Sequence, residues 1–170
     1  RFIGMNGLKR VIVGENSLSN AEGDFSLKNC LNVMELVIGS GSMKWFKSME
    51  IASVPALEAM RIGGDSLKNV NEMRLVGLPK LKRVEVGEDS FTNKNGSFVL
   101  KNCMSVNELV VGNRSMSSFS SFQITTMPSL KMITIGDGCL KKVGAFALSG
   151  LSGLESVVIG SDSFSQRSGN

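Results

Sequence analysis

The chain has 170 residues, of which 42% are hydrophobic and 20% are charged, and its 19 basic and 15 acidic side chains give a formal net charge of +4. This size and composition are typical of a soluble chain that buries one core. No stretch approaches the roughly 18 consecutive apolar residues of a membrane helix, so we expect no membrane insertion in this segment. The chain has no His, so catalysis would lack its most common proton carrier near neutral pH.

An L-x-x-V-x-V-G phrase recurs along the chain at spacings of 24 or 25 residues. Its glycines, in chain order, are Gly14, Gly39, Gly63, Gly87, Gly112, Gly136 and Gly160. Self-similarity at a fixed period of about 20–50 residues is the signature of a solenoid or a related array. We therefore expect residues 1–170 to form one solenoid of about seven 24-residue coils.

Each coil opens with an F-x-L pattern and closes with the V-x-V pattern before its glycine, as in Phe98-Val99-Leu100 and Val84-Glu85-Val86. This alternation has the period of two that strands require. No ten-residue stretch shows helical spacing free of Gly and Pro. The sequence therefore predicts an all-β-leaning solenoid with two short parallel strands per coil and little helix.

Two corners join the strands of each coil. Pro55, Pro79 and Pro128 all lie eight residues before a repeat glycine, where a missing N–H ends strand pairing and turns the chain. At the other corner, we expect the repeat glycine itself to turn the chain by adopting a positive φ.

The phrases Val84-Glu85-Val86-Gly87-Glu88-Asp89-Ser90-Phe91 and Val157-Val158-Ile159-Gly160-Ser161-Asp162-Ser163-Phe164 resemble leucine-rich repeats of the BspA-like type, with Ser in place of that family's Ala. The resemblance covers nearly the whole chain. It departs from the family in unit length, in having Gly where many leucine-rich repeats have Asn, and in its F-x-L-x-x-L-P strand. The resemblance implies a leucine-rich-repeat stack, a cell-surface or extracellular location and a role in adhesion or protein interaction. It also leaves open which strand lines the concave side, and we expect the L-x-x-V-x-V strand.

A longer repeat of three coils overlies the short one. Shifting the sequence by 73 residues aligns 8–72 with 81–145 at 32 identical positions out of 65. Duplication alone explains this pattern, because stacked coils need no triplet rhythm. A surface pattern that repeats every three coils is the alternative.

No catalytic, cofactor-binding or metal-binding constellation stands out, so we expect a non-enzymatic protein without a cofactor. Ser149-Gly150-Leu151-Ser152-Gly153 resembles a nucleophile elbow but spans a repeat corner rather than a strand-to-helix turn. Cys30 and Cys103 occupy the same core position three coils apart, about 14 Å at strand spacing, and this is too far for a disulfide. We expect them and Cys139 to be buried free thiols. Two sequons, at Asn95 and Asn113, fall in corners where a glycan would fit.

The outward positions of the L-x-x-V-x-V strand form the candidate protein-binding face. These residues are Arg10, Ile12, Glu35, Val37, Arg61, Arg83, Glu85, Glu108, Val110, Thr134 and Val158. The mixture of both charge signs with β-branched residues and no aromatic side chain favours a protein partner over nucleic acid. For any single position, strand propensity explains the β-branched residue equally well.

The repeat does not require an aromatic residue at Trp45, because the equivalent position three coils later is Ser118. Trp45 is therefore a candidate exposed contact. Phe46 and Phe119 are expected to fill the interior of their corners.

Neither end of the chain has the sequence features of a capping unit, and uncapped strand edges invite pairing. We therefore expect either a segment of a longer array or ends covered by another subunit. The second possibility makes a structural filament or sheath subunit, built by end-to-end or lateral association, the alternative to a recognition module.

Overall fold

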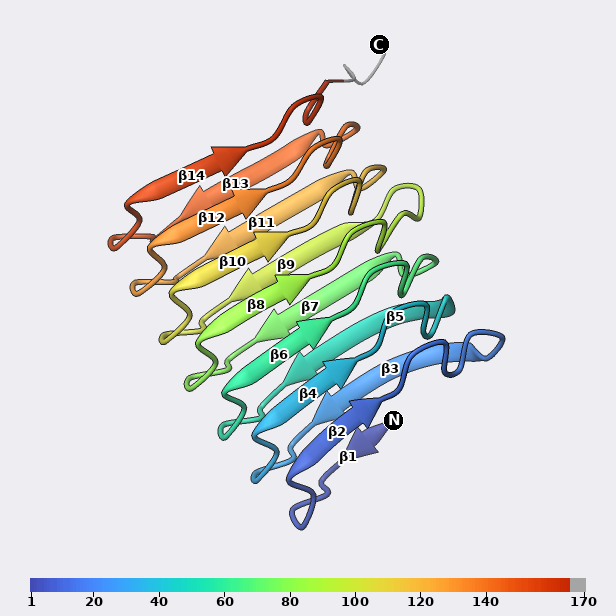
Figure 1. Cartoon of the computed structure of the whole chain (residues 1–170). Coiled ribbons are helices and arrows are strands. Elements are labelled where there is room, and N and C mark those ends of the chain that lie inside the picture. The colour runs from blue at the N-terminus through green and yellow to red at the C-terminus, as the bar shows by residue number, and fades with distance from the viewer. Residues whose placement is uncertain (166–170) are drawn as a thin grey trace.

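The computed structural model describes residues 1–165 and shows two seven-stranded, all-parallel β-sheets that face each other, with no helix in that range. The chain passes alternately through the sheets, so that each coil contributes one strand to each sheet (Figure 1). Sheet 1 contains β2 (Arg10–Val13), β4 (Glu35–Ile38), β6 (Ala59–Ile62), β8 (Arg83–Val86), β10 (Glu108–Val111), β12 (Met132–Ile135) and β14 (Ser156–Ile159). Sheet 2 contains β1 (Phe2–Ile3), β3 (Glu22–Lys28), β5 (Trp45–Ala52), β7 (Glu72–Val76), β9 (Ser97–Lys101), β11 (Ser121–Thr125) and β13 (Ala145–Ser149). The predicted solenoid of about seven coils with two parallel strands each is confirmed. The last five residues of the predicted array, 166–170, lie outside the described range.

Residues that occupy the same position of the repeat phrase pair with one another in the sheet. Val84 of β8 pairs with Met60 of β6 on one side and with Leu109 of β10 on the other, and all three hold the same place in the phrase. Side chains alternate between the two faces of a strand, so one register keeps every apolar position pointing inward.

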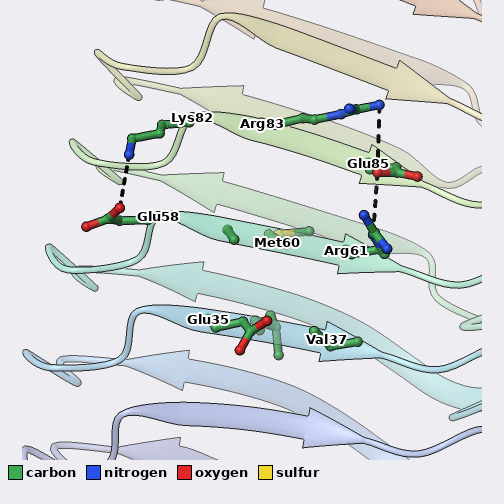
Figure 2. A pocket seen from close by; sticks show the side chains of 10 residues that line it. Glu35, Val37, Glu58, Met60, Arg61, Lys82, Arg83 and Glu85 are labelled. Carbon is green, nitrogen blue, oxygen red and sulfur yellow. Dashed lines mark hydrogen bonds and ion pairs between the residues drawn. The ribbon is translucent and has the colours of Figure 1, made fainter.

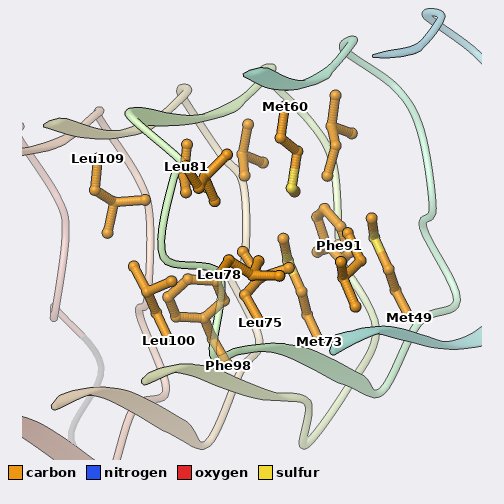
Figure 3. Packing of buried hydrophobic residues seen from close by; sticks show 14 of the residues in the cluster. Met49, Met60, Met73, Leu75, Leu78, Leu81, Phe91, Phe98, Leu100 and Leu109 are labelled. Carbon is orange, nitrogen blue, oxygen red and sulfur yellow. The ribbon is translucent and has the colours of Figure 1, made fainter. Parts of the chain in front are cut away.

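The core fills the space between the sheets as stacks of equivalent residues (Figure 3). Phe98 and Phe122 stack with ring centroids 4.8 Å apart, and Phe122 continues the stack to Phe146 at 5.6 Å. Met49 and Met73 fill the same position in the coils before Phe98, and both are fully buried. Apart from the outermost coils, the inward positions of both sheets are closed to solvent, and each coil depends on its neighbours for that closure.

The corner that follows each strand of sheet 2, here called the opposite corner, contains the three prolines. Pro55, Pro79 and Pro128 all lie in turns, as predicted. The turn begins with a left-handed residue ten positions before each repeat glycine, with φ between 53° and 65°. These residues are Gly4, Asn29, Ser53, Gly77, Asn102, Thr126 and Gly150.

The prediction that the repeat glycines adopt a positive φ is wrong. None of them lies in the left-handed region, which is instead occupied by the residues two and four positions later, such as Asp89 and Phe91 after Gly87. The requirement for glycine is contact: a Cβ on Gly87 would lie 2.4 Å from the backbone nitrogen of Gly64 in the preceding coil. We call this turn, which follows each strand of sheet 1, the glycine corner.

A ladder of buried hydroxyls runs through the glycine corner. Ser90 Oγ donates to the carbonyl of Gly63 in the preceding coil at 3.1 Å and accepts from the N–H of Ser66 at 3.2 Å. Ser42 and Ser66 repeat both contacts. The ladder satisfies backbone groups that the turn would otherwise leave buried without partners.

Strands β3 and β5 are longer than the others and are irregular at their first residues. Their register shifts between Gly23 and Asp24, so that Lys47 has no partner in β3 while Trp45 and Phe46 pair with Glu22 and Gly23. Such a bulge turns the bulged strand and re-aims its side chains. Phe46 packs partly buried against the core and Phe119 is fully buried, as predicted for residues that fill the interior of a corner, whereas Trp45 faces outward with half of its surface exposed.

Candidate functional site

The predicted binding face is the outer face of sheet 1. All eleven of its predicted residues are exposed or partly exposed on the strands β2 to β14. The adjacent outward positions Ala59, Met132 and Ser156 complete the surface. The structure therefore brings the predicted residues together on one surface, because the register holds over all seven strands.

Ion pairs cross the middle of this face from strand to strand. Arg83 Nε lies 3.3 Å from Glu108 Oε2 on β10, and its Nη2 lies 3.7 Å from Glu85 of its own strand. Glu85 also receives Arg61 of β6 at 3.5 Å. Farther along, Arg10 Nε donates to Glu35 Oε2 at 2.6 Å. Each acid has a base on a neighbouring strand, which orders the side chains but contributes little stability because the pairs are solvent-exposed.

A depression of about 410 Å³ opens in this face over β4, β6 and β8 (Figure 2). Its cause is Ala59, whose register neighbours are Glu35 on one side and Arg83 on the other. The short Ala side chain leaves a gap between two long charged ones, and Val37 of β4, which also points outward, lines the gap beside it. Across the rim, Lys82 Nζ contacts Glu58 Oε2 at 3.0 Å. The depression therefore has an apolar base and a rim of both charge signs.

Exposed apolar side chains lie on the outer strands of the sheet 1 face, beside the Arg10–Glu35 ion pair at one end and beyond Glu108 at the other. Ile12 is 56% exposed on β2, and Val158 is 50% exposed on β14, with Val110 and Thr134 partly exposed between the centre and β14. A face that combines ordered ion pairs with exposed apolar side chains offers a partner both orientation and buried apolar area.

The predicted glycosylation positions, Asn95 and Asn113, both lie in exposed turns of the glycine corner. Asn113 Oδ1 accepts the N–H of Asp137 at 2.9 Å, and the hydroxyl of its sequon residue Ser115 is buried in the serine ladder. Asn95 has a left-handed φ of 59° and its sequon residue Ser97 opens β9. Of the two, Asn95 is the less constrained by tertiary contacts.

The three cysteines are buried free thiols, as predicted. Burial raises the pKa of Cys103 to about 11, and it also raises the pKa of Cys139. Because the thiolate is the reactive form, burial makes both side chains poor nucleophiles at neutral pH.

Residues 1–165 contain no cluster of His, Cys, Asp or Glu that could hold a metal ion. Ser149 ends strand β13 and leads into a turn rather than a helix, so the elbow geometry is not formed there.

Two surface features were not anticipated from the sequence. The first is a ridge of exposed apolar residues along the opposite corner, each eight positions before a repeat glycine: Leu31, Pro55, Pro79, Met104 and Pro128. The second is a series of basic residues along the glycine corner. Aligning the repeats would have found the first, because all five residues occupy one repeat position, whereas the second depends on which lysines lack acidic partners.

The described part of the chain includes no helix that is long and apolar enough to cross a membrane. No family model matches the sequence, and no curated protein or solved structure is significantly similar to it.

Proposed function

We propose that this protein is a non-enzymatic recognition module that binds a protein partner through the outer face of sheet 1. The observation that supports the proposal is the depression at Ala59, where an apolar base is surrounded by fixed charges of both signs. An apolar side chain of a partner would enter it while flanking charges meet Glu35, Arg61 and Arg83. Interfaces favour this combination of a desolvated centre and a polar rim.

The resemblance to BspA-like leucine-rich repeats extends the proposal to adhesion at a cell surface or in the extracellular space. A solenoid suits this role because its outer face grows by one strand per coil while the core remains the same. Free thiols are compatible with it, because stacked coils close their core without disulfides.

Paired charge reversals on the two sheets test the proposal. Arg61→Glu with Arg83→Glu changes the rim of the depression, and Arg74→Glu with Lys101→Glu makes the same change of charge on sheet 2. Immobilised wild type and the sheet 2 variant should retain the same protein from surface and secreted fractions of the source organism. The sheet 1 variant should retain it at least about tenfold less, because a pair of mispaired interface charges costs more than about 1.4 kcal/mol.

Circular dichroism and thermal unfolding of all three proteins serve as the folding control. Equal retention by the two variants, or no specific retention by the wild type, would contradict the proposal.

A second candidate function is a filament subunit, and the outermost described coil supports it. Phe146, Val157 and Ile159 are 39%, 42% and 47% exposed, although the equivalent side chains of interior coils are buried. Another coil stacked on β13 and β14, from the same chain or from another copy, would cover them. Light scattering across a concentration series tests self-association: growing particles that are abolished by Val157→Lys with Ile159→Lys would support the filament, and a constant monomer mass would contradict it.

A further inference from the structure

A basic track follows the glycine corner, at the right-hand edge of Figure 1 and on a different side of the coil from the depression at Ala59. It consists of two shallow depressions of about 420 Å³ and 330 Å³, which adjoin because both are lined by Thr92. Six basic side chains line them, whereas the only acidic one is Asp89. The basic residues are Lys44, Lys68, Lys94, Arg114, Lys141 and Lys142.

Carboxylates of the same chain form ion pairs with three of these six basic residues, but the track keeps a net positive charge. Asp65 contacts both Lys44, at 2.5 Å, and Lys68, and these two ammonium groups hold the pKa of Asp65 below its usual range. Arg114 donates two hydrogen bonds to Asp89, of 2.6 and 2.7 Å, and also contacts Glu88 at 3.4 Å. Lys94, Lys141 and Lys142 make no ion pair within residues 1–165. The surplus of positive charge is therefore available to an external anion.

Trp45 stands at one end of the track. It is the only Trp in the chain, its side chain is 51% exposed, and the bulge of β5 directs it outward beside Lys44. The acid opposite it in register, Glu22, is paired with Lys47 at 3.4 Å. An exposed indole next to paired and unpaired cations gives the track a flat apolar surface on which a ring can pack.

Amide and hydroxyl groups occupy the space between the cations. Asn69 Nδ2 donates to the carbonyl of Lys44 at 2.9 Å, and Asn93 Nδ2 donates to the carbonyl of Asn69 at 2.7 Å, so each amide is tied to the preceding coil. Thr92, Ser117 and Ser118 add hydroxyls. These groups suit a ligand that is rich in hydroxyls as well as charged.

We propose that the basic track binds an acidic polysaccharide, carrying sulfate or carboxylate groups, with a sugar ring packed on Trp45. Successive coils are about 4.8 Å apart, which is close to the length of one sugar unit in an extended chain, so a linear glycan lying across the coils meets a new set of donors at each unit. Single-stranded nucleic acid needs repeated aromatic platforms, and the lining contains one aromatic residue. An acidic peptide would gain little from a lining whose other members are polar.

The fluorescence of Trp45 tests the proposal directly, because the chain has no other Trp and no Tyr. The probes are a heparin-derived octasaccharide, an octamer of galacturonate, a neutral cello-oligosaccharide, an oligothymidylate and polyglutamate. One of the two acidic oligosaccharides should shift or quench the emission saturably, and the comparison between them identifies the anionic group. Raising NaCl from about 50 to about 300 mM should weaken that binding at least about tenfold, because the contacts are exposed ion pairs.

Matched variants separate the track from general attraction to a basic protein. Lys94→Glu, Lys141→Glu and Lys142→Glu together should abolish binding, whereas Lys9→Glu, Lys80→Glu and Lys101→Glu, which make the same change of charge elsewhere, should weaken it less than about threefold. By calorimetry, Trp45→Ala should lower affinity at least about tenfold and Trp45→Phe should retain most of it.

Three results would overturn the proposal: no response to either acidic oligosaccharide, equally tight binding of oligothymidylate or polyglutamate, or equal loss in the two triple variants. The double variant Arg61→Glu with Arg83→Glu should bind the oligosaccharide like wild type. The proposal for the basic track can therefore be tested independently of the proposal for the protein-binding face.

Discussion

The two corners of each coil turn the chain by different means. At the glycine corner, every coil has Gly at the same position, and from Gly39 onward an added Cβ would lie 2.4 to 2.8 Å from the backbone of the preceding coil. At the opposite corner, the turn residue is left-handed in every coil, yet it is Gly only in Gly4, Gly77 and Gly150. A Cβ on Gly77 would meet nothing within 4 Å.

This difference shows that close backbone contact excludes other residues from a glycine position more strictly than a left-handed conformation does. The left-handed region costs a non-glycine residue about 1–2 kcal/mol, which Asn reduces by local hydrogen bonding, and the opposite corner accordingly accepts Asn29, Asn102, Ser53 and even Thr126. Backbone overlap has no such remedy, because neither partner atom is at the end of a flexible side chain. Close backbone contact with the preceding coil therefore recurs in every coil from Gly39 onward at the glycine corner, whereas at the opposite corner it is found at Gly153.

The sharpest test of this comparison is Gly87→Ala. The new methyl group would lie 2.4 Å from Gly64 N and 2.6 Å from the carbonyl carbon of Gly63, so β8 must move away from the preceding coil. We expect a loss of about 3–5 kcal/mol in the free energy of unfolding, measured by urea denaturation. Gly14→Ala is the matched control, because its nearest neighbour is the Ser17 hydroxyl at 3.3 Å, and equal losses in the two variants would refute the contact explanation.

Removal of a ladder hydroxyl should have the next largest effect. Ser90→Ala leaves the Gly63 carbonyl and the Ser66 N–H without their partner in a fully buried site. An unpartnered buried polar group costs about 1–3 kcal/mol, so we expect a loss of about 2–3 kcal/mol by urea denaturation. Ser105→Ala, at an exposed position of the opposite corner, should change stability by less than about 0.5 kcal/mol. If Ser90→Ala were as mild as Ser105→Ala, the ladder would be irrelevant to stability.

The sequence was sufficient for the coil number, the strand positions and the inward and outward residues. All three follow from a repeat of 24 or 25 residues with alternating apolar positions, and stacking the coils propagates one correct register to all of them. The prediction for the repeat glycines failed for a physical reason: a positive φ and a close contact both select Gly, and the sequence does not say which applies.

The candidate sites were predicted less completely. The repeat placed Arg61, Glu85 and their neighbours on one face, but the depression at Ala59 depends on the lengths of side chains on adjacent strands. The basic track depends on which lysines share Asp65 and which have no acid. Lys68 is only three residues from Asp65, but Lys44 and the register neighbours of Ala59 lie about 20 or more positions from their partners and on different coils, so these arrangements become visible only when the coils are stacked.

At the opposite corner, substitution of Gly77 should have a smaller effect than substitution of Gly87. Gly77→Ala places a Cβ in open space but at a φ of 64°, so we expect a loss of about 1–2 kcal/mol from conformation alone. Gly77→Asn should lose less, because Asn already occupies this position at Asn29 and Asn102. Thermal unfolding of the two variants beside wild type measures the difference. A loss for Gly77→Ala as large as that for Gly87→Ala would mean that the two corners are equally crowded.

The smallest effect, and the only expected gain, concerns the one interruption of the serine ladder. Cys139 occupies a ladder position and donates its Sγ–H to the Gly112 carbonyl at 3.1 Å. However, the N–H of Ser115 bonds to the Gly112 carbonyl at 3.2 Å rather than to the sulfur, which is a weak acceptor. A hydroxyl would accept that N–H, as it does in the other coils, so Cys139→Ser should raise the free energy of unfolding by about 0.5–1 kcal/mol.

The same substitution at the opposite corner supplies the control, because there it should have the opposite sign. Cys103 is buried among positions that hold Val54, Leu78 and Met127 in the neighbouring coils, and its Sγ donates to the carbonyl of Lys101 at 3.4 Å, but no hydroxyl ladder continues through these apolar positions. Cys103→Ser should therefore lower the free energy of unfolding by about 1–2 kcal/mol, because it replaces an apolar thiol by a more polar hydroxyl whose neighbours in the adjacent coils are apolar side chains. Urea denaturation of the two variants under reducing conditions compares them directly. If both substitutions changed the free energy of unfolding in the same direction, the two corners would not differ in whether they favour a hydroxyl over a thiol.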